Sequence, residues 1–245
     1  MRTIVISAYI RKGGTLTVLR DCLRYLSGRP ELRVTALVHK RELCDFPGID
    51  YIEIPWSIDG WGKRLKCEYV TMKGISEKLQ PVDLWLSLHD TTPNVVAKRQ
   101  AVYCQTSFPF LKVRLRDFRM DKKIPLFALF TKYVYKKKIH RNGYLIVQQN
   151  WLREGLSKML RVDRKKFIVA PPKFMNPAFE DTSGGESAPM FLYPATPDCH
   201  KNFEVLCAAA ERLEKKIGAG VFKVVLTIDG TENKYAAWLR GDGDT

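Results

Sequence analysis

Apolar runs typical of buried strands alternate along the chain with amphipathic patterns typical of helices. The run at residues 3–10 is rich in β-branched side chains, a basic loop ending in Gly13 and Gly14 follows it, and apolar residues at helical spacing occupy 16–26. Further strands are predicted at 32–39, 51–54, 83–88, 101–104, 144–147 and 167–169, and further helices at 63–79, 126–139 and 151–160. This alternation predicts an α/β fold with a doubly wound, Rossmann-like sheet.

A stretch that contains several Pro, Gly and Ser residues separates this pattern from a second, shorter one. Residues 173–189 show almost no periodicity, which predicts a linker between a first domain, 1–172, and a second domain, 190–245. The second domain is predicted to hold strands at 190–193 and 222–228 and helices at 202–217 and 233–239. Two strands are too few for a sheet that buries its own core, so we expect a partial second Rossmann-like domain.

Composition narrows the class of protein. The 245 residues are 45% hydrophobic, enough for a globular core, and the six cysteines show no Cys-x-x-Cys spacing. No signal peptide is recognised before the first strand, so we expect unpaired thiols in a reducing compartment and no metal site. No apolar run approaches the roughly 18 to 20 residues that cross a bilayer, so any membrane contact is expected to be peripheral.

The positive charge is concentrated in one segment. The net charge of +15 favours an anionic partner, which is nucleic acid, a phosphorylated substrate or an acidic membrane. Residues 111–141 contain eleven Lys or Arg against two Asp, with apolar and aromatic residues between them. This mixture suits an anionic bilayer surface, where each basic residue contributes roughly 1 kcal/mol. The alternative is a helix with an apolar core face and solvated lysines.

The predicted strand at 190–193 leads into Lys201 and Asn202, which open an amphipathic helix. This layout puts a cation and free backbone N–H groups where an anion could sit. A plain N-cap by Asn202, beside a solvated lysine, is the alternative. The segment resembles the strand, loop, Lys-Asn and helix of family-four glycosyltransferases, two-domain enzymes of the GT-B fold in which this lysine holds the diphosphate of a nucleotide-sugar donor. The resemblance implies that Lys201 and Asn202 bind the donor.

Two loops that follow predicted strands carry further candidates. Gly13 and Gly14 let a ligand approach the backbone at a helix N-terminus, and the family has a Gly-Gly loop after its first strand, which implies a donor contact; an ordinary tight turn is the alternative. His89 and Asp90 end an apolar strand, and ligands bind at the carboxyl ends of strands in open α/β sheets. His89 is therefore a candidate substrate contact, or else the start of a loop.

A third loop departs from the family pattern. Many members carry a histidine near the reacting sugar where this chain has Gln105, and glutamine forms hydrogen bonds but exchanges no proton near neutral pH. The resemblance implies that Gln105 orients the acceptor; satisfaction of loop backbone is the alternative. The segments 144–160 and 166–172 also resemble the family, as scaffold.

Two features of the family are missing. Residues 194–199 lack the arginine that many members carry, and the family's Glu-x7-Glu motif would fall beyond residue 245. Glu204 and Glu211 are seven apart rather than eight and belong to another helix. We therefore expect a fragment or a naturally shortened form.

The resemblance implies a retaining glycosyltransferase that moves a sugar from a nucleotide-sugar donor to a glycan or lipid-linked acceptor in cell-surface polysaccharide synthesis. No cofactor is expected, since the nucleotide-diphosphate sugar is a substrate. The expected location is cytoplasmic, on the inner face of the membrane, with residues 111–141 against the anionic lipid surface. A truncated non-catalytic relative or a basic binding module is the alternative. Nucleic acid is not an expected partner, because no RNA-binding signature or helix-turn-helix pattern is evident.

Overall fold

The computed structural model describes residues 1–120, 122–172 and 188–241. The chain divides into two compact units, the first comprising Met1–Phe110 and Phe130–Phe174 and the second Leu111–Leu129 and Met175–Thr245. Residues 111–129, which the sequence predicted as part of the first domain, group with the second unit. Residues 173–187 of the predicted linker lie outside the described residues.

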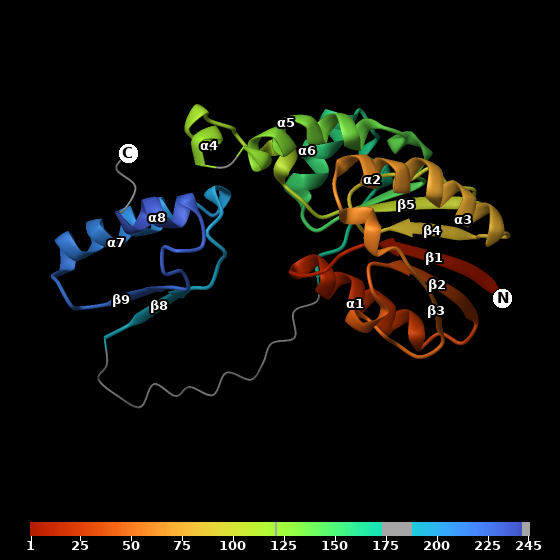
Figure 1. Cartoon of the computed structure of the whole chain (residues 1–245), viewed down its shortest axis with the longest axis horizontal. Coiled ribbons are helices and arrows are strands. Elements are labelled where there is room, and N and C mark those ends of the chain that lie inside the picture. Colours follow the sequence, from red (N-terminus) through yellow and green to blue (C-terminus); the bar gives the residue numbers. More distant parts are fainter. Residues whose placement is uncertain (121, 173–187, 242–245) are drawn as a thin grey trace. The chain divides into compact units, whose positions relative to one another are not determined.

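The first unit is built on a seven-stranded parallel sheet with the order β3-β2-β1-β4-β5-β6-β7 (Figure 1). Its strands are β1 Arg2–Ala8, β2 Leu32–Val38, β3 Ile49–Glu53, β4 Leu84–Ser87, β5 Arg99–Cys104, β6 Tyr144–Val147 and β7 Phe167–Val169. Strand β1 pairs with β2 and β4, so that Ile4 lies beside Val34 and Leu84. Each predicted strand of this unit is confirmed, and the parallel pairing confirms the predicted α/β sheet.

Helices cover the sheet on both faces. On one face α1 (Gly14–Ser27) packs four buried leucines at helical spacing, Leu16, Leu19, Leu23 and Leu26, against β1, β2 and β3. The other face is covered by one long helical segment, composed of α2 (Trp61–Lys66), a π-helical turn (Cys67–Thr71) and α3 (Met72–Lys78), and by α5 (Lys123–Lys136) and α6 (Asn150–Leu160). These positions confirm the predicted helices, since amphipathic stripes bury their apolar side against the sheet.

The second unit is smaller. It contains α4 (Leu115–Met120), the first part of α5, the two parallel strands β8 (Met190–Tyr193) and β9 (Lys223–Leu226), and the helices α7 (Phe203–Ile217) and α8 (Lys234–Arg240). Phe203 is fully buried, and its ring meets the rings of Tyr193 and Tyr235 edge-on. The predicted elements of 190–240 are confirmed, whereas α4 was not predicted.

None of the helices in the described part of the chain is long and apolar enough to cross a bilayer.

Candidate functional site

The first unit brings three predicted loops to one edge of its sheet. Strands β1, β4 and β5 are neighbours and parallel, so the loops that follow them leave the sheet at the same edge. These loops carry Gly13 and Gly14 after β1, His89 after β4 and Gln105 after β5. The chain leaves β1 toward β2 on one side and reaches β4 on the other, which makes this edge a topological switch point. Ligands of open α/β sheets bind at such points.

Gly13 and Gly14 form an open backbone surface at the start of α1. Gly13 has φ of 81°, a value in the left-handed region that favours glycine, and its carbonyl accepts the backbone N–H of Leu16 at 3.0 Å. No atom lies within 4 Å of the position that a Cβ would take at either glycine. The space beside both glycines is therefore open at the start of a 14-residue helix, where an anionic group is favoured.

His89 is held inside the protein by both ring nitrogens. Nδ1 lies 2.8 Å from the carbonyl oxygen of Ser7, and Nε2 lies 2.7 Å from Oε1 of Glu68. Only 4% of the side chain is exposed, and the ring stacks at a tilt on Tyr9 with 4.5 Å between centroids. The two ring nitrogens thus face two acceptor oxygens, which hold the ring in place.

Glu68 is a buried carboxylate at the centre of the network. Its Oε1 accepts hydrogen bonds from Nε of Arg64 at 3.0 Å and from the Thr91 hydroxyl at 2.8 Å, in addition to the contact with His89. Burial on its own would raise the pKa of this carboxyl, but the charge and hydrogen bond of His89, followed by Arg64 and Thr91, lower the pKa to about 2. Oε2 is buried and forms no hydrogen bond to a described residue.

Arg64 links this network to Tyr9. Its guanidinium carbon lies 5.0 Å from the centroid of the Tyr9 ring, and Nη2 donates to the carbonyl of His89 at 3.4 Å. Burial lowers the pKa of Arg64, but Glu68, together with Tyr9 and Asp90, outweighs burial and the net shift is upward. We call Tyr9, Arg64, Glu68, His89 and Thr91 the Glu68 cluster. Its arginine and its histidine share one carboxylate, and all of its members belong to the first unit.

Asp90 ties the loop after β4 to the loop after β5. It adopts a φ of 69°, in the left-handed region, and its Oδ1 accepts the backbone N–H groups of Gln105 at 2.5 Å and Thr106 at 3.2 Å. The side-chain amide of Gln105 donates to the carbonyl of Leu88 at 2.6 Å. Burial raises the pKa of Asp90 against these hydrogen bonds. The two loops are therefore fixed to each other.

Lys201 and Asn202 lie in the second unit, immediately before α7. Lys201 ends a single 3₁₀ turn, Cys199–Lys201, and its carbonyl accepts the hydroxyl of Tyr193 at 2.9 Å, while its side chain is exposed. Asn202 stands at the N-cap position of α7 with φ of 58° and makes no side-chain hydrogen bond to the helix. The first N–H of α7, from Phe203, donates to the hydroxyl of Tyr235 at 3.1 Å. That hydroxyl donates in turn to the carboxylate of Glu204.

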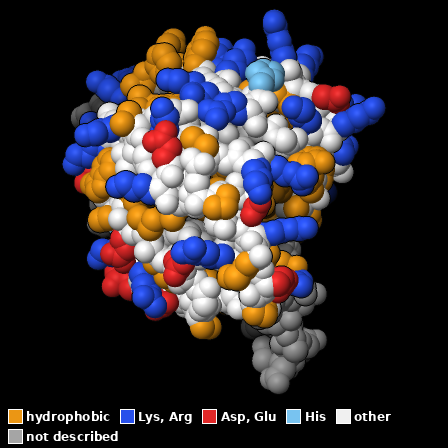
Figure 2. All heavy atoms as spheres, turned by 90° about the vertical axis from the view of Figure 1, so that its right-hand side faces the viewer, with side chains coloured by type: hydrophobic (Ala, Val, Ile, Leu, Met, Phe, Trp, Pro, Cys, Tyr) orange, Lys and Arg blue, Asp and Glu red, His pale blue; other side chains and the backbone are white. Residues whose placement is uncertain are grey.

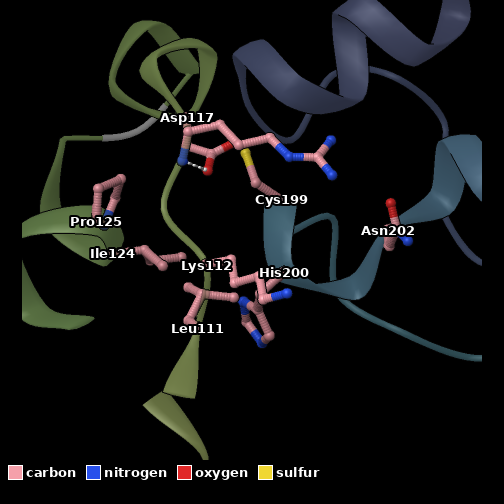
Figure 3. Close-up of a pocket in the computed structure, with 9 residues that line it drawn as sticks. Leu111, Lys112, Asp117, Ile124, Pro125, Cys199, His200 and Asn202 are labelled. Carbon is pink, nitrogen blue, oxygen red and sulfur yellow. Dashed lines mark hydrogen bonds between the residues drawn. The ribbon is translucent and has the colours of Figure 1, made fainter. Parts of the chain in front are cut away.

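A pocket of about 200 Å³ lies in the second unit beside this loop (Figure 3). It is lined by Leu111, Lys112, Arg114, Asp117, Ile124, Pro125, Cys199, His200 and Asn202. Leu111 and Lys112 lie next to His200, whose pKa is lowered first by burial and further by Lys201, against Asp198 (Figure 3). Asp117 accepts the backbone N–H of Arg114 at 2.7 Å. Since drug-sized ligands occupy about 300 to 1,000 Å³, this pocket suits a smaller group beside an apolar wall.

The Glu68 cluster was not found from the sequence, although a signal for part of it exists. Glu68, Met72 and Ser76 recur every four residues and form one buried line on the helical segment. A charged residue on a buried line predicts a buried ion pair, and Arg64 lies one turn earlier. Among the described residues, no three His, Cys, Asp or Glu side chains are grouped so that they could hold a metal ion.

No family model and no curated protein matches this sequence. The crystal structure of a glycosyltransferase from Rickettsia africae superposes with a TM-score of 0.58 at 13% identity, over 98% of this chain and 64% of that one. The wall teichoic acid polymerase TagF, solved with CDPG, gives 0.42 at 13% identity over 93% and 56% of the two chains. Phytolacca americana UGT2, solved with UDP-2-fluoro-glucose and pterostilbene, gives 0.43 at 12% identity over 93% and 71%.

These solved structures are glycosyltransferases or polymerases, and the likeness to the Rickettsia africae protein establishes the fold. This chain shares its α/β, Rossmann-like architecture and spans about 64% of that protein's length. The other two structures superpose with TM-scores below 0.5, too low to support a conclusion about this chain.

Proposed function

We propose that this protein is a glycosyltransferase that moves a sugar, with retention of configuration, from a nucleotide-diphosphate sugar to a glycan or lipid-linked acceptor in cell-surface polysaccharide synthesis. One observation carries the proposal: the loops after β1, β4 and β5 meet at the switch point of a seven-stranded parallel sheet, in a fold shared with a glycosyltransferase. Fold alone does not determine chemistry, so the residues of these loops must account for it.

For the donor, we assign one contact region in each unit. In the first, the open backbone of Gly13 and Gly14 at the start of α1 offers N–H groups to an anionic phosphate. In the second, Lys201 offers an exposed ammonium, and Asn202 lines the adjacent pocket. Backbone N–H groups and an ammonium are each groups that bind phosphate, so each region is proposed as a donor contact within its own unit. No cofactor is required in this proposal.

For the acceptor, we assign roles to His89 and Gln105. Both ring nitrogens of His89 are engaged by Ser7 and Glu68, so we assign His89 the role of holding the loop after β4 in place rather than that of exchanging a proton with substrate. Gln105 is tied to this loop through the carbonyl of Leu88 and through Asp90, which positions its amide to orient an acceptor hydroxyl. Rigid support of this kind is what positional catalysis requires.

We further propose that the protein works on the cytoplasmic face of the membrane, with α5 against anionic lipid. Along α5, the side chains of Leu126, Leu129, Phe130 and Tyr133 are 46%, 47%, 59% and 60% exposed. Their spacing of three, one and three residues places them on one helical face, and lysines flank them. An exposed apolar stripe beside cations suits the head-group region of a bilayer.

Calorimetric titration with UDP- and GDP-sugars tests the donor assignment. We expect one of these donors to bind, and Lys201→Ala to weaken its binding by about tenfold, the loss of one charge-assisted contact to phosphate. The matched control is Lys216→Ala, which removes an exposed lysine at the other end of α7. Equal affinity of wild type and Lys201→Ala would remove the assigned role of Lys201, and absence of binding by every donor would remove the proposed function.

Vesicle sedimentation tests the membrane assignment. Phe130→Ser should lower binding to vesicles that contain anionic lipid, because it removes an apolar side chain from the proposed contact. Tyr25→Ser, at a 63% exposed tyrosine on α1, is the control and should leave binding unchanged.

A further inference from the structure

A second group of charged side chains in the first unit surrounds one neutral oxygen. Oδ1 of Asn94 accepts hydrogen bonds from Nζ of Lys138 at 2.7 Å and from Nη1 of Arg141 at 2.8 Å. The charges of Lys137 and Lys73 also act on Lys138. We call Lys73, Asn94, Lys137, Lys138 and Arg141 the Asn94 cluster.

The protein fixes this oxygen in place. The backbone N–H of Asn94 donates to the carbonyl of Glu68 at 2.8 Å, and its Nδ2 donates to the carbonyl of Tyr69 at 3.2 Å. Both donor groups of Asn94 are thus used by the π-helical turn, and Oδ1 is left to face the cations. Arg141 is anchored a second time, because Nη2 donates to the carbonyl of Val95 at 2.9 Å.

The backbone of Lys138 is also held in an unusual conformation. Its φ of 61° lies in the left-handed region, which a residue with a side chain rarely adopts. Such conformations persist where the surrounding structure over-determines them, and they recur at ligand sites. Here Lys138 in this conformation donates to Oδ1 of Asn94, which also accepts a hydrogen bond from Arg141.

The positive charges of this cluster are not balanced by a carboxylate. Among the described residues, no Asp or Glu lies within ion-pair distance of Lys137, Lys138 or Arg141, and Lys73 meets only Glu77, at 3.7 Å. The pKa of Lys138 is lowered, first by burial and then by Arg141, Lys137 and Lys73. Like charges brought together on a neutral oxygen repel one another, and a bound anion would relieve that repulsion.

The cations Lys138 and Arg141 lie apart from the candidate site, whereas Asn94 follows His89 in the same connection between β4 and β5. Arg141 comes shortly before β6, so it belongs to the amino end of that strand, whereas the loops of the candidate site follow the carboxyl ends of β1, β4 and β5. Figure 2 views the end of the molecule at which β1 begins. Lys and Arg side chains gather over the upper half of that face, and most of its Asp and Glu side chains lie in the lower half.

We propose that the Asn94 cluster binds a phosphate group, either that of a free phosphate compound or that of an anionic lipid head group. Lys138 has two N–H donors beyond the one given to Asn94, Lys137 has an exposed ammonium over the Tyr69 ring, and Arg141 keeps further N–H groups. Three cations with directed donors match the charge and the several acceptor oxygens of phosphate. This binding does not depend on the proposed sugar transfer.

Calorimetric titration of the full chain with pyrophosphate, in low salt, tests the site. A pair of variants removes equal charge from two places: Lys138→Gln with Arg141→Gln in the cluster, and Lys158→Gln with Lys165→Gln on exposed positions elsewhere in the first unit. We expect saturable binding in the wild type and in the control pair, and binding at least about tenfold weaker in the cluster pair. Equal weakening in both pairs, or no binding of pyrophosphate by the wild type, would overturn the proposal.

A third variant guards against loss of folding. Asn94→Asp keeps an oxygen beside Lys138 and Arg141 but supplies the negative charge from within, so it should fold and still lose pyrophosphate binding. Sedimentation with phosphatidylcholine vesicles, with and without phosphatidic acid, then distinguishes the sources. Binding of phosphatidic acid vesicles that Asn94→Asp abolishes identifies a lipid head group, and pyrophosphate binding without it identifies a free phosphate compound. Unchanged pyrophosphate binding by Asn94→Asp would contradict the site.

Discussion

The Glu68 cluster and the Asn94 cluster share one π-helical turn, Cys67–Thr71, and treat positive charge in opposite ways. The side chain of Glu68 supplies a buried carboxylate to His89 and Arg64, while its backbone carbonyl holds Asn94, whose neutral oxygen meets Lys138 and Arg141. In the first case the protein completes its own ion pairs, which then serve as support. In the second it gathers cations and leaves them unbalanced. The Asn94 cluster, proposed to bind phosphate, thus differs from the Glu68 cluster, which supports the structure, in having a neutral oxygen where the other has a carboxylate.

The largest expected effect comes from removing the carboxylate of the first cluster. Glu68→Gln leaves Arg64 and His89 without their shared partner, and breaking a buried pair in this way costs about 3 to 5 kcal/mol in the free energy of unfolding. Urea denaturation measures it. Glu77→Gln, on the same helical segment but in an exposed pair with Lys73, is the control and should change stability by less than about 1 kcal/mol. Similar values for the two variants would show that the Glu68 pair is not balanced as described.

The contribution of Glu68 to the free energy of unfolding should also depend on pH. The pKa of Glu68 is about 2 in the folded chain against an ordinary value of 4.5, so its ion pairs contribute fully above pH 4.5, and the contribution is lost as pH falls through about 2. The difference in unfolding free energy between wild type and Glu68→Gln should shrink steadily over that window. A difference that stays constant from pH 5 to pH 2 would contradict the lowered pKa.

The variant Asn94→Asp gives the Asn94 cluster a carboxylate, as the Glu68 cluster has, and so tests the difference between the two. In Asn94→Asp the new carboxylate faces Lys138, so the pKa of that lysine, lowered in the wild type, should rise. Titration of the Lys138 side chain by nuclear magnetic resonance follows this directly. Lys158, an exposed lysine of α6 that is not a member of the cluster, serves as the internal reference. A Lys138 pKa that stays where it was would mean that its surroundings, rather than the missing negative charge, set its value.

The smallest expected effect on stability comes from the two glycines at the carboxyl edge of the sheet, where one substitution strains the backbone and the other does not. Gly13→Ala places a side chain at φ of 81° and should cost about 1 to 2 kcal/mol, although no neighbouring atom obstructs it. Gly14→Ala, one residue later and inside α1, should instead stabilise by about 0.5 to 1 kcal/mol. Thermal unfolding distinguishes the two. Equal shifts would show that the strain is not local to Gly13.

The sequence predicted the scaffold well because each strand and helix of an α/β fold has a pattern of apolar residues that can be recognised within a short segment. The β-branched run that became β1 and the leucines of α1 are each readable within a dozen residues. The loops after β1, β4 and β5 were found for the same reason, since each follows a recognisable strand. The roles of Gly13, Gly14, His89, Gln105, Lys201 and Asn202 remain predictions.

The Glu68 and Asn94 clusters were much harder to predict from the sequence. Glu68 meets His89 across 21 positions of sequence, and Asn94 meets Arg141 across 47, so neither contact follows from spacing. Residues 111–141 were recognised as basic, but the pattern could not show that Lys138 and Arg141 converge on an asparagine far upstream. Helix α4, six residues long, was missed because fewer than two turns leave too few positions for the i, i+3, i+4, i+7 pattern.

The π-helical turn at Cys67–Thr71 has a consequence for how this helix can change length. Such a turn contains one residue more than the regular spiral, and Val70 within it is 63% exposed. Glu68, within the turn, accepts a hydrogen bond from the Thr91 hydroxyl, and Ser76, in α3, accepts one from the backbone N–H of Val96, so one extended loop is fixed to the helix at two points. Deleting Val70 would remove the extra residue and let the turn continue as a regular α-helix, so Ser76 would stay on the same face as Glu68 and both contacts would be kept.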